Sequence, residues 1–137
     1  MTYIGGCVCG ALRYESVSPP VESGYCHCRL CQRTSAAPVL VFASFSVAGF
    51  RYTSGAPTIY YSTEHGTREI CPKCGTQIAY RQAEGAETVD VNAGCLDDPT
   101  TITPTHHIWC SSRIPWFETA DSLPRYDAGK PDDAELG

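Results

Sequence analysis

The stretch Tyr25-Cys26-His27-Cys28-Arg29-Leu30-Cys31 places three thiols within six residues, and no fourth thiol lies near it in the sequence. A zinc ion with a structural role is enclosed by four protein ligands, whereas a reactive zinc ion keeps one position for water or substrate. The stretch therefore predicts an open metal site, and this site is the main indication of function in the chain.

A glycine-framed pair of thiols precedes this stretch, in Gly5-Gly6-Cys7-Val8-Cys9-Gly10. In a straight strand, side chains two residues apart are separated by about 6–7 Å, which is too far for two thiolates on one zinc ion. We therefore predict a tight turn, which the glycines permit. Taken alone, the pair is equally compatible with a turn that merely buries its thiols.

A second pair lies in Ile70-Cys71-Pro72-Lys73-Cys74-Gly75 and is the most specific short motif of the chain. Proline restricts the turn after the first thiol, and the final glycine allows a left-handed backbone that directs amides at the sulfurs. The motif is typical of a zinc knuckle. The alternative is a redox C-x-x-C motif, which should open a long helix, whereas residues 77–81 have the pattern of a strand.

Composition limits the classes of function. The chain has 137 residues and nine cysteines, seven of them in these clusters, which favours metal binding over a disulfide framework. The first residues lack the pattern of a secretory signal, so we expect a cytoplasmic protein. A net charge of −5 argues against nucleic acid as a partner. The longest apolar run, residues 39–45, is too short to cross a membrane.

Short β-rich segments separated by turns predict a mainly β protein with antiparallel sheets. Residues 28–34 lack glycine and proline and suit a single helical turn, which would direct Cys28 and Cys31 to the same side. The chain beyond Tyr126 is expected to have little order. The segments predicted as strands are residues 11–15, 21–25, 39–45, 50–52, 58–62, 67–70, 77–81, 87–92 and 108–110.

The other cysteines and histidines are weaker candidates. Cys95 and Cys110 lack partners at metal-binding spacing, so we expect inert thiols, although either could complete the open site. We expect His27 to point away from the metal, as a solvated residue or as a support for a ligand. For His65 and the adjacent pair His106-His107, ordinary packed or surface imidazoles are expected, and only one of the adjacent pair could approach a metal.

The order of these motifs resembles the glutathione-dependent formaldehyde-activating enzyme family, which shares its domain with centromere protein V. The motifs that carry the resemblance are G-G-C-V-C-G, Y-C-H-C-R-L-C, C-P-K-C-G-T, A-G-C-L-D-D-P, I-P-W-F and L-P-R-Y. The resemblance implies a Mss4-like fold of antiparallel β-sheets with little helix, tied together by zinc. It places a zinc domain at residues 1–126 and leaves residues 127–137 as an acidic, poorly ordered C-terminal tail.

The resemblance also implies the ligands and the activity. Cys7, Cys9, Cys71 and Cys74 would hold a structural zinc ion, and Cys26, Cys28 and Cys31 would hold a second, catalytic one, so that two Zn²⁺ ions are expected per chain. The implied activity is that of a carbon–sulfur lyase, which forms or breaks S-hydroxymethylglutathione or a related adduct of a small, glutathione-like thiol.

Two other functions are compatible with the same residues. A non-enzymatic zinc scaffold would follow if Cys95 or Cys110 closed the second site, because a closed site is less reactive. A thiol redox sensor is the weaker possibility. The family pattern usually has serine where Cys95 stands, which is why this residue is a candidate fourth ligand.

Overall fold

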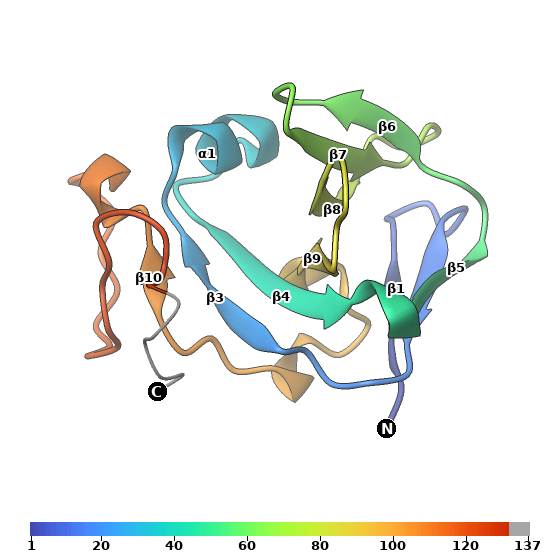
Figure 1. The fold of residues 1–137 in the computed structure, drawn as a ribbon, viewed down its shortest axis with the longest axis horizontal. Helices are drawn as coiled ribbons and strands as arrows, with labels where there is room; N and C mark the ends of the chain where they lie inside the picture. The colour runs from blue at the N-terminus through green and yellow to red at the C-terminus, as the bar shows by residue number, and fades with distance from the viewer. Residues whose placement is uncertain (132–137) are drawn as a thin grey trace.

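The computed structural model describes residues 1–131, which form a mainly β protein as predicted (Figure 1). An antiparallel three-stranded sheet consists of β1 (Tyr3–Gly6), β2 (Arg13–Ser16) and β5 (Phe50–Ser54). A seven-stranded sheet has the order β10 (His107–Ile108), β3 (Glu22–Cys26), β4 (Leu40–Ser46), β9 (Thr88–Asn92), β8 (Gln77–Gln82), β7 (Gly66–Ile70) and β6 (Thr58–Tyr61).

Helical structure is scarce in the described residues. The single α-helix, α1 (Arg29–Ser35), follows β3 and lies above the ends of β3 and β4, across from the β6–β7 hairpin (Figure 1). Four short 3₁₀ turns complete the secondary structure: η1 (Val47–Gly49), η2 (Ala93–Cys95), η3 (Pro99–Thr101) and η4 (Cys110–Ser112). No helix within residues 1–131 is both long and apolar enough to cross a membrane.

The main core fills the space between the two sheets. Phe45, Ile78, Val89 and Val91 are completely buried, and the ring of Phe45 lies 5.5 Å from that of Tyr3 on β1. Burial of each large apolar side chain contributes about 1.5–3 kcal/mol. The alternation of buried and partly exposed residues along β9 is the pattern from which this strand was predicted.

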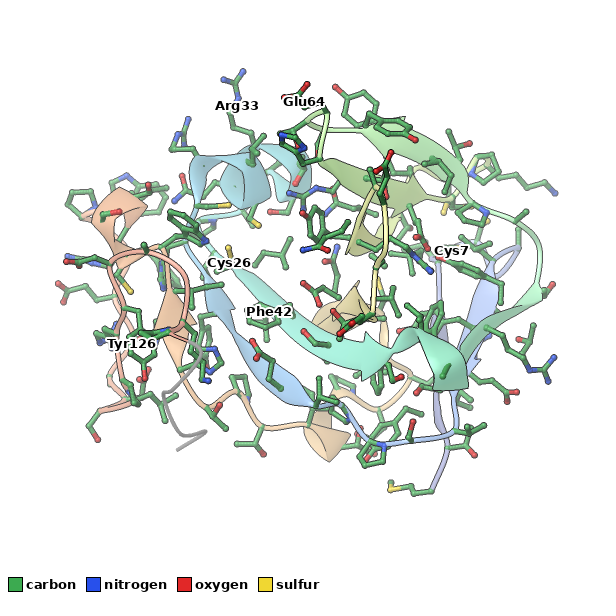
Figure 2. All side chains as sticks on the ribbon, viewed as in Figure 1. Cys7, Cys26, Arg33, Phe42, Glu64 and Tyr126 are labelled. Carbon is green, nitrogen blue, oxygen red and sulfur yellow. The ribbon has the colours of Figure 1, made fainter. Side chains whose placement is uncertain are left out.

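A second, smaller core cluster lies at the other end of β3 and β4. It consists of Cys26, Cys31, Leu40 and Phe42, and Ile108 of β10 packs against it. Figure 2 shows Cys26 and Phe42 on the same side of these strands, whereas Arg33 of α1 points away from the body of the protein. Two of the three thiols of the predicted open site are therefore part of a packed apolar cluster.

Three features differ from the prediction. β1 was not predicted, because the two glycines at its end resemble a turn. The strand predicted at residues 108–110 is instead β10, which ends at Ile108, because Trp109 has a left-handed backbone with φ of 58°. β10 also pairs in parallel with β3, the only parallel pairing between strands in residues 1–131.

The predicted boundary at residue 126 stays a prediction. Residues 126–128 accept backbone hydrogen bonds from Trp109, Cys110 and Ser111, at 2.9, 3.0 and 3.3 Å. The chain just beyond Tyr126 is thus held against the segment that follows β10. Most of the predicted acidic tail lies outside the described residues.

Candidate metal centres and the adjoining cavity

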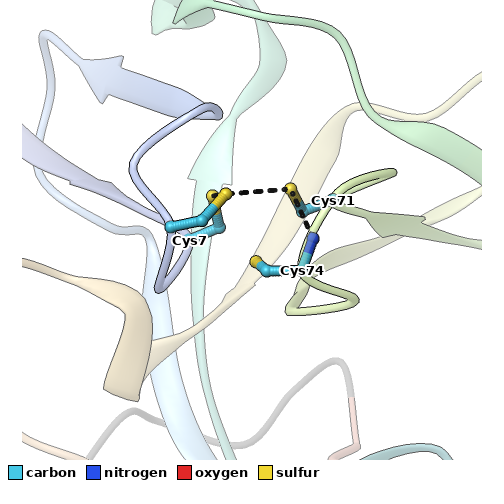
Figure 3. Close-up of side chains that lie close together, drawn as sticks. Cys7, Cys71 and Cys74 are labelled. Carbon is cyan, nitrogen blue, oxygen red and sulfur yellow. Dashed lines mark hydrogen bonds between the residues drawn. The ribbon is translucent and has the colours of Figure 1, made fainter.

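Four of the predicted thiols meet at one point between the two sheets. Cys7 and Cys9 come from the turn after β1, and Cys71 and Cys74 come from the turn between β7 and β8; all four sulfurs lie within 4.8 Å of one another (Figure 3). The Cys7–Cys9 and Cys9–Cys71 sulfur distances are 3.6 and 3.8 Å. Tetrahedral zinc with Zn–S bonds of about 2.3 Å requires about 3.8 Å between sulfurs, so this cluster fits the ion.

Backbone amides support these sulfurs. The amide of Leu12 donates to the Cys7 sulfur at 3.3 Å, and the amide of Cys74 donates to the Cys71 sulfur at 3.5 Å. The hydroxyl and the amide of Thr76 lower the pKa of Cys74 to about 5. Such donors stabilise thiolates, the form in which cysteine binds a metal. The left-handed φ of 78° at Gly75 gives the turn its predicted form.

The remaining cluster comes from one short stretch of chain. Cys26 ends β3, Cys28 is the N-cap of α1, and Cys31 lies in the first turn of that helix; their sulfurs also lie within 4.8 Å of one another. The Cys28 sulfur accepts a hydrogen bond from the Cys31 amide at 3.2 Å. The predicted helical turn thus brings the three thiols together, as its spacing required.

The protonation of these three thiols is linked. The Cys28 thiol has a lowered pKa because its neighbours Cys26 and Cys31 donate to it, and the pKa of Cys26 is raised by the same contacts and by burial. Three ionised sulfurs this close together need a compensating positive charge. A bound dication would supply it, so the donor set fits a metal ion with three thiolate ligands.

A cavity of about 590 Å³ opens beside these three thiols. Its walls are mainly apolar, and a few charged and polar side chains reach into it. They belong to α1, to β3 and β4, to the β6–β7 hairpin, to β8 and β9, and to the end of β10. The lining includes Cys26, Cys28, Cys31, Glu22, Arg29, Leu30, Leu40, Phe42, Ser62, Thr63, Arg68, Tyr80, Asp90, Asn92, Ile108 and Trp109.

Two charged groups of this lining, one buried and one half-buried, were not singled out from the sequence. Arg68 of β7 is 4% exposed, and both its terminal nitrogens lie 4.0 Å from the Cys31 sulfur. Asp90 of β9 accepts a hydrogen bond from Ser44 at 2.6 Å, and burial raises the pKa of its carboxyl. In the sequence both residues look like ordinary polar positions of alternating strands.

The sequence model of the family described as glutathione-dependent formaldehyde-activating enzyme matches residues 2–112, most of the chain. The chain belongs to this family. The resemblance carried by the cysteine motifs is thereby confirmed.

Individual relatives agree with the family at low identity. A Halomonas elongata protein, provisionally named a glutathione-dependent formaldehyde-activating enzyme, is 26% identical over 140 residues, covering 95% of this chain and 89% of the relative. A Schizosaccharomyces pombe protein named an uncharacterized lyase is 23% identical over 101 residues, covering 74% and 73%. A crystal structure of a Rhodobacter sphaeroides protein has a TM-score of 0.56 at 19% identity, covering 89% and 98%, and supports the fold.

The expectation that His27 is a solvated residue is wrong. Its side chain is 1% exposed, and its Nε2 lies 2.8 Å from Nδ1 of His107. His107, also buried, has its Nε2 3.0 Å from a carboxylate oxygen of Asp121. His27 does point away from the thiols, because it pairs with a residue of β10 that is 80 positions distant in the sequence.

The other candidate residues lie outside the three-thiol cluster. Cys95 is half-buried against the main core, with its sulfur 3.6 Å from the carbonyl oxygen of Gln77. Cys110, also half-buried, lies in η4. Among residues 1–131, neither belongs to a group of potential metal ligands. His65 is on the surface, and His106 is packed within the protein.

Gln32 is a further residue that the sequence did not reveal. Its side chain is buried in α1 and donates to the backbone oxygens of His27 at 2.8 Å and of Ser112 at 3.1 Å. It thereby ties the helix to the loop that carries the thiols and to the C-terminal segment. No sequence signal separates it from an exposed helical glutamine, because both partners are backbone atoms.

Proposed function

We propose that the chain is a zinc-dependent carbon–sulfur lyase that acts on a glutathione-like thiol adduct. In this proposal Cys7, Cys9, Cys71 and Cys74 hold a structural zinc ion, and Cys26, Cys28 and Cys31 hold a catalytic one. The observation that carries the proposal is the contrast between a four-sulfur cluster and a three-sulfur cluster that borders a cavity. Family membership and the lyase name of one relative support the reaction class.

The reaction joins a thiol to an aldehyde. A carbon–sulfur bond forms, the thiol proton is transferred to the former carbonyl oxygen, and the reverse reaction breaks the same bond. A zinc ion held by three thiolates would supply a position for the substrate sulfur and would lower the pKa of its thiol from about 8.5.

The residues of the chain have separate roles in this proposal. The apolar walls of the cavity, Leu40 and Phe42 among them, exclude water from the reacting sulfur and strengthen electrostatic interactions there. Asp90 is the candidate proton carrier, because burial raises the pKa of its carboxyl and so keeps a proton on it at higher pH than is usual for aspartate.

Exchange between formaldehyde, glutathione and S-hydroxymethylglutathione, followed by NMR, tests the proposal. The wild-type protein should accelerate the exchange, and Cys31→Ser should abolish the acceleration. Cys110→Ser is the matched control, because it removes a half-buried thiol outside both clusters. Equal exchange rates with and without the protein would exclude formaldehyde as a substrate.

The alternative of a non-enzymatic scaffold predicts a closed second site. Neither Cys95 nor Cys110 lies within ligand distance of the three thiols, which favours the enzyme. X-ray absorption of the zinc-loaded protein distinguishes the two. Four sulfurs on both ions would support the scaffold, and three sulfurs with one lighter atom on one ion would support the lyase.

A further inference from the structure

Arg68 is unusual among the arginines of the described residues, because it is buried without a carboxylate partner. The arginines at positions 13, 51, 81, 113 and 125 each lie within 4.0 Å of an acidic side chain, and no such pair is found for Arg68 in residues 1–131. A buried guanidinium without a negative partner is costly. The direct partner of Arg68 must therefore be another kind of group, although its charge also acts at longer range on the carboxylate of Asp90.

The contacts of Arg68 identify that group as the three-thiol cluster. Nη1 and Nη2 both lie 4.0 Å from the Cys31 sulfur, so the guanidinium presents its two-pronged end to the thiol. The rest of the side chain is fixed, because its carbon Cζ stacks 4.8 Å from the ring centre of Tyr80 and Nε donates to the Ser62 hydroxyl at 3.3 Å. Arg68 is therefore held in place, with its guanidinium against the Cys31 sulfur in the lining of the cavity.

The neighbouring residue shows that this arrangement is specific to one face of β7. Glu69, next along the strand, points to the opposite face, where it pairs with Arg81 and accepts a hydrogen bond from Tyr52 at 2.6 Å. The nearest carboxylate on the same strand thus has its own partners. Glu69 therefore does not neutralise Arg68, whose charge acts on the thiols and, at longer range, on Asp90.

This inference rests on the proposed function. The charges of the groups that line the cavity indicate what Arg68 does there. The charged groups that line the cavity are Glu22, Asp90, Arg29, Arg68 and the three cysteines. With a zinc ion bound and every acid ionised, three thiolates and two carboxylates face one dication and two guanidinium groups, which leaves one net negative charge. Without Arg68 the site would be more negative by one charge, whether or not Asp90 holds a proton, and an incoming thiolate would be repelled more strongly.

We propose that Arg68 is a specificity-determining residue that stabilises the thiolate form of the substrate, by placing its guanidinium against the sulfurs of the site. It thereby makes the site selective for ligands that bring an anionic sulfur. Neutral thioethers gain nothing from this charge. If Arg68 instead bound a carboxylate of the substrate far from its sulfur, a thioether analogue would keep that carboxylate and would lose affinity as much as the thiol does.

Calorimetric titration of the zinc-loaded protein tests the role, with glutathione compared with S-methylglutathione, and 2-mercaptoethanol compared with its S-methyl ether. Arg68→Met should weaken binding of both thiols at least about tenfold, because one opposite charge within about 4–6 Å changes ionisation by that factor or more. Binding of the thioethers should change less than about threefold. Arg33→Gln, an exposed arginine on α1, is the matched control and should change neither.

Equal weakening of thiols and thioethers, or unchanged thiol binding, would overturn the proposal, as would a wild-type protein that binds no thiol. If the wild type binds 2-mercaptoethanol but not glutathione, the proposal of a glutathione-like substrate is wrong. The role of Arg68 is then tested by the binding of 2-mercaptoethanol and its S-methyl ether alone. The zinc content is measured in every variant. If Arg68→Met loses zinc, Arg68→Lys, which keeps the positive charge, is measured instead. Thiol binding by Arg68→Lys within about threefold of wild type supports the role of the charge, and a tenfold loss refutes it.

Discussion

The two cysteine clusters should contribute unequally to stability, because they join very different lengths of chain. Cys9 and Cys71 are 62 positions apart, whereas Cys26 and Cys31 are five apart. In the chain-entropy model, a cross-link across about 60 residues stabilises the fold by about 4 kcal/mol, and one across about six residues by about 2 kcal/mol. A metal ion that joins the turn after β1 to the β7–β8 turn therefore constrains the unfolded chain more.

Cys74→Ser and Cys31→Ser compare the two clusters directly. Structural zinc contributes on the order of 10 kcal/mol to folding. Because a domain is stable by only about 5–15 kcal/mol in total, Cys74→Ser should leave the protein largely unfolded. Cys31→Ser should leave the protein folded, because the ligands of this site lie in one short stretch whose cross-link contributes only about 2 kcal/mol and the two sheets stay joined through the four-thiol cluster. It should nevertheless abolish lyase activity.

Urea unfolding followed by far-ultraviolet circular dichroism measures these effects, with the zinc content of each sample determined beforehand. Cys110→Ser serves as the control, with an expected change within about 0.5 kcal/mol, as for substitutions away from special sites. The reasoning is refuted if Cys74→Ser unfolds at the wild-type urea concentration. It is equally refuted if Cys31→Ser is the less stable of the two.

Three further substitutions test the surroundings of the sites. Asp90→Asn should raise stability at neutral pH. Burial raises the pKa of Asp90, so the wild-type protein loses stability as the pH rises from the pKa of the unfolded state to that of the folded state. The urea midpoints of the two proteins should therefore differ at pH 7 and converge below about pH 4. Its lyase activity should fall, if Asp90 carries the proton. Gln32→Leu should cost about 1–3 kcal/mol in urea unfolding, because it leaves two backbone oxygens without a donor. Cys95→Ser should leave the zinc content, measured by atomic emission, unchanged.

Local patterns predicted most of the fold. The strands of the central sheet follow from short β-rich segments, and the turn geometry of the cysteine pairs follows from glycine and proline. The three-thiol cluster was also predictable, because its members lie within one helical turn of each other and of the strand end. In each case the physical cause is contained in about ten consecutive residues.

Contacts between distant residues were not predictable in the same way. His27 was expected to be solvated because neighbours of metal ligands often face outward, but β10 returns beside β3 and buries it against His107. Arg68 is the same kind of case, since its place in the alternation of β7 does not reveal that α1 lies opposite. The pairing of distant strands decides such positions, and the local patterns of a single sequence do not reveal that pairing.

Because the three thiols come from one short stretch of chain, an open metal site can coexist with a stable fold. Cys26, Cys28 and Cys31 are joined by only a few residues, and hydrogen bonds of Gln32 and the packing of Leu40 hold the loop and helix in place. If a substrate sulfur displaces a ligand or changes the charge at this site, the two sheets still remain joined through the four-thiol cluster. Separation of the two tasks would let the reactive site exchange ligands, because little of the folding free energy depends on its coordination.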